Sequence, residues 1–133
     1  MQYMTVKEIH FYTRVWLNRI LFYKREATLY IDHVTKVLVD NRDMENVRLL
    51  ITKEMQLALK RDELVQLKEH INSLEHKLAD YHQHHTFADH HHYVEVFEQI
   101  KLKMEHFEKS YAKALHNLDE VLFKYIKVEK MQA

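Results

Sequence analysis

The chain concentrates imidazole side chains in one short stretch. Six of its twelve histidines lie between residues 82 and 92. Neutral imidazole is a good ligand for zinc, nickel and copper, and carboxylates often complete such a site. His85 and Asp89 are four residues apart, and Asp89 and His92 are three apart, so each pair would share one face of a helix. The spacing predicts a candidate metal site, with zinc or nickel as its ion, made of His84, His85, Asp89 and His92.

The same stretch has a second interpretation, because polar turns between helices tolerate histidine. Consecutive residues such as those at 90–92 cannot all point in one direction on a helix. The chain contains neither the His-Glu-x-x-His pattern of zinc proteases nor the Glu-x-x-His pairs of di-iron bundles. Histidine also titrates near pH ~6.5, so mild acidification adds positive charge here. We therefore keep two hypotheses, a metal- or pH-responsive site and a solvated turn.

One further histidine lies in a short motif. His33-Val34-Thr35-Lys36 resembles the His-x-x-Lys core of histidine phosphotransfer domains, which are helical bundles of similar size. The resemblance covers four residues and implies that His33 would carry a phosphoryl group. That family has small residues, glycine among them, after the motif, where this chain has valine and leucine. The position of His33 beside a hydrophobic seam favours a partly packed structural histidine instead.

Other catalytic chemistry has little support in the residues. The chain contains no glycine and no cysteine, which excludes glycine-rich phosphate loops, disulfides and thiolate catalysis. Ser73 and Ser110 are the two serines, and neither has a recognisable motif around it. Most carboxylates fall at solvated positions of the predicted helices, where few loops are available to form a pocket. We expect a protein that is not an enzyme.

The elements that must position these residues are long helices, because proline is absent as well. Without glycine and proline a chain has few ways to turn. We expect helices over about residues 5–39, 44–81 and 87–130. Asn41 is best suited to a glycine-like conformation at the first break, and the second break is expected at residues 82–85. The sequence therefore predicts one domain over residues 1–133.

Apolar residues in the three segments recur at steps of three and four, which is typical of helices that pack along a shared seam. The most regular run contains Tyr93, Phe97, Ile100, Met104, Phe107, Tyr111, Ala114, Leu118, Val121, Tyr125 and Val128. Helices of about 35 to 45 residues would each be about 50 to 65 Å long. The simplest all-α fold is an elongated, antiparallel up-down-up bundle of three long helices with coiled-coil-like heptad packing.

The first helix carries more apolar surface than one seam requires. A second apolar line runs beside its heptad positions and widens the apolar arc. Large uncovered apolar faces usually mark interfaces. We therefore predict a protein that acts through protein–protein association, most simply as a homodimer, or with another helical protein. The predicted interface residues are Phe11, Val15, Trp16, Phe22 and Leu29.

Charge and hydropathy argue against other partners. Twenty basic and twenty acidic residues give a formal net charge of zero, which disfavours nucleic-acid binding through phosphate neutralisation. The most apolar run, residues 15–23, is interrupted by Asn18 and Arg19 and has less than half the length needed to span a bilayer. The first residues carry charge where a signal peptide needs an apolar core. We expect no nucleic-acid partner, no membrane span and a cytoplasmic location.

Overall fold

The structure is a computed structural model of the chain, and it describes residues 4–40, 44–83 and 87–132. Side chains are described over residues 4–40, 45–80 and 90–124. The described chain is almost entirely helical. Its elements are α1 (Val6–Asp40), α2 (Met44–Gln83) and α3 (Phe87–Gln132).

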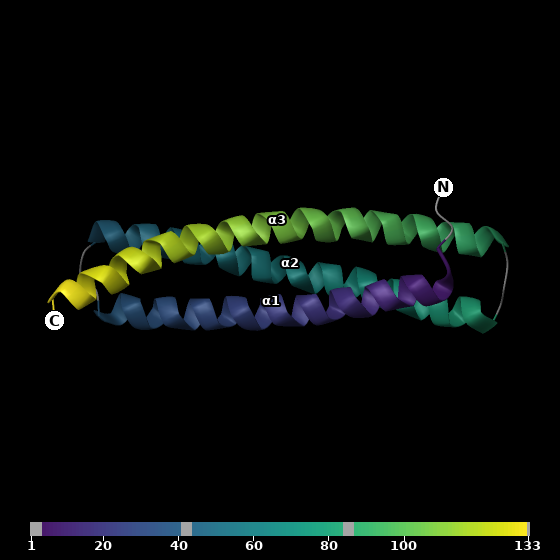
Figure 1. The fold of residues 1–133 in the computed structure, drawn as a ribbon, viewed down its shortest axis with the longest axis horizontal. Coiled ribbons are helices and arrows are strands. Elements are labelled where there is room, and N and C mark those ends of the chain that lie inside the picture. The colour runs from purple at the N-terminus through teal and green to yellow at the C-terminus, as the bar shows by residue number, and fades with distance from the viewer. Residues whose placement is uncertain (1–3, 41–43, 84–86, 133) are drawn as a thin grey trace.

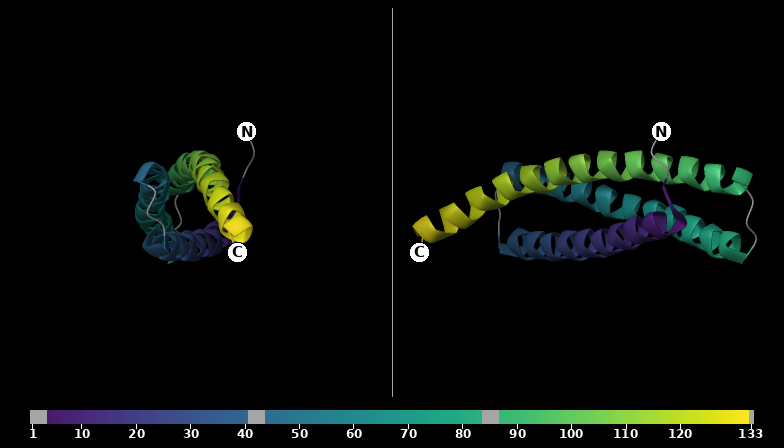
Figure 2. Two further views of the ribbon diagram at one scale, coloured as in Figure 1. Left: turned by 90° about the vertical axis from the view of Figure 1, so that its left-hand side faces the viewer. Right: turned by 45° about the vertical axis from the view of Figure 1, so that its right-hand side comes forward.

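The three helices lie along one long axis (Figure 1). α1 runs in one direction, α2 returns, and α3 runs in the direction of α1, so the predicted all-α up-down-up bundle is confirmed. The start of α1, the end of α2 and the start of α3 therefore lie at one end of the molecule. Seen nearly along its axis, the bundle has a triangular cross-section (Figure 2).

The helix ends differ from the predicted ones by at most two residues. α1 begins after Thr5, whose hydroxyl oxygen accepts a hydrogen bond of 3.1 Å from the backbone N–H of Glu8. Such an N-cap satisfies one of the amide groups that a helix start leaves without an intrahelical partner. The second break was predicted too early, because α2 continues through His82 to Gln83. Asn41 lies outside the described residues.

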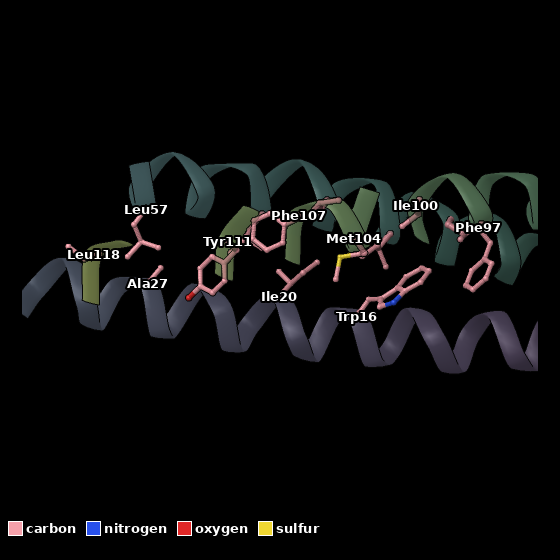
Figure 3. Close-up of a cluster of buried hydrophobic side chains, with 14 of the residues drawn as sticks. Trp16, Ile20, Ala27, Leu57, Phe97, Ile100, Met104, Phe107, Tyr111 and Leu118 are labelled. Carbon is pink, nitrogen blue, oxygen red and sulfur yellow. The ribbon is translucent and has the colours of Figure 1, made fainter. Parts of the chain in front are cut away.

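The core consists of residues at the predicted spacing of three and four. In α3 every residue of the regular run from Tyr93 to Val121 is buried, and the side chains of Tyr125 and Val128 lie outside the described set. α2 contributes a row of leucines that includes Leu57, and α1 contributes Ile20 and Ala27 (Figure 3). Burying each large aliphatic side chain contributes roughly 1.5 to 3 kcal/mol. The seams predicted from the sequence therefore form one continuous core.

The three helix pairs are not equally close. α2 packs along both α1 and α3, whereas α1 and α3 approach each other at fewer positions. α1 therefore has two neighbours, as its broad apolar arc suggested, but α3 leaves part of that arc uncovered.

None of the described helices combines the length and the apolar character that crossing a bilayer requires.

Candidate protein interface

Two open cavities follow one another between the parallel helices α1 and α3, and together we call them the α1–α3 groove. The first, near the start of α1, has a volume of about 760 Å³. The wall of this cavity on α1 includes Phe11, Val15 and Trp16, and the wall on α3 includes Phe97 and Glu98. Both walls also carry charge, from Glu8 and Arg19 on α1 and mainly from glutamates on α3.

A second cavity, of about 590 Å³, opens between the same two helices farther along the bundle. Leu29 and Phe123 supply much of its apolar surface, from α1 and α3 respectively. His33, the histidine of the phosphotransfer-like motif, is exposed and borders this cavity together with His116. Phe11 and Leu29, the two ends of the predicted interface, therefore each line one of the two cavities between α1 and α3.

Four of the predicted interface residues form a line on the outer face of α1, which we call the α1 stripe: Phe11, Val15, Phe22 and Leu29. The side chains of Phe11, Phe22 and Leu29 are 63, 59 and 70% exposed, and Val15 is partly buried. At 3.6 residues per turn these positions fall within about 40° of one another around the helix, on the side away from the core. Over the described residues, the α1 stripe is therefore an apolar line whose three largest side chains are mostly exposed.

Trp16, the fifth predicted interface residue, belongs to the core instead. Its side chain is only 5% exposed and stacks on Phe97 of α3, with ring centroids 4.9 Å apart and planes 17° from parallel (Figure 3). Position 16 lies on the heptad seam with Ile9, which turns the indole toward α3 rather than toward the α1 stripe. Trp16 thus contributes to the floor of the first cavity and not to the exposed line.

Tyrosine–carboxylate pairs connect α1 to α3 beneath the groove. The phenol of Tyr111 on α3 donates a hydrogen bond of 2.6 Å to Oε1 of Glu26 on α1. In the opposite sense, the phenol of Tyr23 on α1 donates to Glu108 on α3. Arg19 Nη1 also reaches Glu108, at 3.3 Å. These reciprocal bonds lie beside the aromatic contacts between the same two helices, such as that of Tyr23 with Phe107, and fix their relative register.

The tyrosines of this contact are held in their neutral form. Burial, followed by the hydrogen bond to Glu108, raises the pKa of Tyr23 to about 12. Burial and a hydrogen bond to Asp119 raise the pKa of Tyr30 to about 12 as well. The pKa of Tyr111 is raised further, by burial and then by its bond to the Glu26 carboxylate. At neutral pH each phenol is a hydrogen-bond donor to a carboxylate.

A second polar contact crosses the bundle between α1 and α2. Thr13 is fully buried, and its hydroxyl group contacts both the backbone oxygen of His10, at 2.8 Å, and the carboxylate of Glu75 on α2. The other carboxylate oxygen of Glu75 lies 2.7 Å from Nδ1 of His10. The sequence does not predict this cluster. Thr13 occupies a heptad position of α1, and Glu75 lies next to it only because α1 and α2 pack together in this register.

The structure describes only some of the candidate metal ligands. His92 is an exposed residue of α3. Asp89 is part of the α3 backbone, but its side chain, like the whole of His84 and His85, lies outside the described residues. Elsewhere at this end, Nε2 of His90 lies 2.7 Å from the backbone oxygen of Met4. Over the described residues, no group of three or more potential ligands is close enough to hold a metal ion.

No family model, curated protein or solved structure matches this chain.

Proposed function

We propose that the protein is a non-enzymatic association module that forms a homodimer through the α1 stripe and the α1–α3 groove. One observation carries this proposal. Three large apolar side chains, each more than half exposed, follow one line on α1 opposite the core, and the two outer ones, Phe11 and Leu29, each line a cavity between α1 and α3. A cytoplasmic location, expected from the sequence, belongs to the same proposal.

The energetics of burial favour this function over a solvated monomer. Isolated exposed apolar residues are normal on protein surfaces, but a contiguous apolar line is typical of an interface. Covering a side chain such as Phe22 or Leu29 contributes roughly 1.5 to 3 kcal/mol. Several such residues on each copy supply a large part of the free energy that a micromolar dimer requires, about 8 kcal/mol.

Sedimentation equilibrium on two matched variants tests the proposal. Phe22→Ser with Leu29→Ser removes the centre and one end of the α1 stripe without altering a buried residue. Leu102→Ser is the control, because Leu102 on α3 is 66% exposed and does not line either cavity. We expect the stripe variant to be monomeric with an unchanged helical circular-dichroism spectrum, and the control to remain dimeric. Equal dissociation of both variants would contradict the proposal.

A further inference from the structure

The two sides of the α1 stripe differ in charge. On the side of the stripe toward α2, α1 carries a basic flank. Its basic residues are Lys7, Arg14 and Arg25, all exposed, and its one acidic residue is Asp32. The order around the helix is set by contacts, because His10 and Thr28 touch α2 whereas Arg19 touches α3. The basic flank therefore lies on the side of the stripe that is farther from the groove.

The opposite wall of the groove is acidic. The carboxylates that line its two cavities from α3 are Glu98, Glu105, Glu108, Asp119 and Glu120. Lys101 is the basic residue of α3 in the same lining. A partner that fits this surface must bring an apolar helix with positive charge on the side that meets α3. The outer face of α1 itself has these properties, which points to a second copy of the chain as the occupant.

Symmetry then decides how the two copies are oriented. If the twofold axis were perpendicular to the helices, the two α1 helices would run antiparallel. The acidic α3 walls of the two copies would then face each other. If the axis runs along the bundle, the α1 helices are parallel, and the basic flank of each copy meets the acidic wall of the other. Like charges at close range disfavour an interface, and opposite charges align it.

Resting on the proposed homodimer, we infer that two copies associate in parallel about an axis along the bundle, with α1 of each copy in the α1–α3 groove of the other. Val15, Phe22 and Leu29 are seven residues apart and so meet their own copies along one seam. α1 is about 52 Å long, and one α1–α1 contact with two flanking α1–α3 contacts approaches the roughly 800 Å² per partner that stable dimers bury.

A charge-reversal pair tests the arrangement of the flank and the wall. The ring of Phe97 contacts both Tyr12 and Trp16, so Arg14 lies close to the level of Glu98, and the parallel dimer places the two on facing copies. We expect Arg14→Glu and Glu98→Lys each to weaken dimerisation by roughly fivefold, and the double variant to recover most of the loss. Lys77→Glu on the exposed face of α2 is the control. A double variant no better than the singles would overturn the inference.

Disulfide trapping gives the orientation directly, because the chain contains no cysteine. Glu8 and Lys36 extend the heptad line of the stripe by seven residues at each end. In the parallel dimer, Glu8→Cys and Lys36→Cys should each cross-link to their own kind in a glutathione redox buffer. Efficient cross-linking only in an equimolar mixture of the two variants would indicate antiparallel helices and overturn the inference, leaving the dimer intact. A wild-type chain that sediments as a monomer at about 100 μM would overturn the proposed function itself.

Discussion

The phenol of Tyr111 lies 2.6 Å from Oε1 of Glu26, although the two residues are 85 positions apart in the sequence. This bond joins α3 to α1, and the pair of Tyr23 with Glu108 repeats it in the opposite sense one helical turn away. The two parallel helices are therefore joined both by these polar bonds and by aromatic contacts such as that of Trp16 with Phe97. The cavities between α1 and α3 open beside this contact.

High pH should destabilise the bundle through these tyrosines. Tyrosine titrates near pH ~10 in an unfolded chain, whereas the pKa values of Tyr23 and Tyr30 are raised to about 12 in the folded one. Between these values the unfolded chain loses protons that the folded chain retains, so the free energy of unfolding should fall as the pH rises. Urea titrations at pH 9, 10 and 11, at one protein concentration, measure this loss.

Tyr111→Phe provides the control for the alkaline effect. This variant removes one phenol with a raised pKa, so its stability should decline less between pH 10 and 11 than that of the wild type. At pH 7 it should be less stable by about 1 kcal/mol, because the bond to Glu26 is lost. The same pH dependence in both proteins would contradict the role given to Tyr111.

Trp16→Ala should act on folding. The indole is buried against Phe97, and truncation of a buried tryptophan costs roughly 3 to 5 kcal/mol. Denaturation followed by circular dichroism measures the change, because the variant has no tryptophan fluorescence. Phe22→Ala, on the exposed stripe, should cost far less in a dilute sample where the protein is monomeric. Equal losses for the two variants would contradict the assignment of Trp16 to the core.

The helices themselves follow from the sequence because nothing in it interrupts them. Because the chain has no glycine or proline, the ends of the three helices could be predicted to within two residues. Periodicity alone does not say whether a seam position meets its own chain or a partner, which is why Trp16 was assigned to an interface. The N-cap at Thr5 has a local signal in the sequence, the glutamate three residues later.

The polar pairs of the groove had no local signal at all. Tyr23 and Glu108 are 85 residues apart, and their pairing depends on the relative register of α1 and α3. Heptad spacing fixes which residues face inward but leaves this register open. The α1–α3 groove could not be predicted from the sequence for the same reason. It depends on how closely α1 and α3 approach each other when α2 packs against both.

The buried contact between Thr13 and Glu75 should be energetically coupled. A double-mutant cycle with Thr13→Val and Glu75→Ala isolates the interaction of the hydroxyl with the carboxylate. We expect a coupling of about 0.5 to 1.5 kcal/mol from urea denaturation, the usual range for one intramolecular hydrogen bond. Thr35→Val, on the exposed part of α1, serves as the comparison with Glu75→Ala and should show no coupling.

Zinc should leave the oligomeric state unchanged, because over the described residues no three potential ligands lie close enough together to hold a metal ion. Light scattering with and without zinc, after removal of bound metal by a chelator, measures the mass. Replacing His84, His85 and His92 by glutamine should not alter the dimer. A stoichiometric change of mass with zinc that this variant lacks would instead support a metal-responsive site at the histidine-rich end.

The solution mass of the wild-type chain as a function of concentration is the most direct measurement. Sedimentation equilibrium near pH 7.5 should give twice the chain mass of 16.4 kDa at high micromolar concentration, with dissociation on dilution. The stripe variant with serine at positions 22 and 29 should give the chain mass throughout. A wild-type protein that remains at 16.4 kDa up to about 100 μM would contradict association through the α1 stripe.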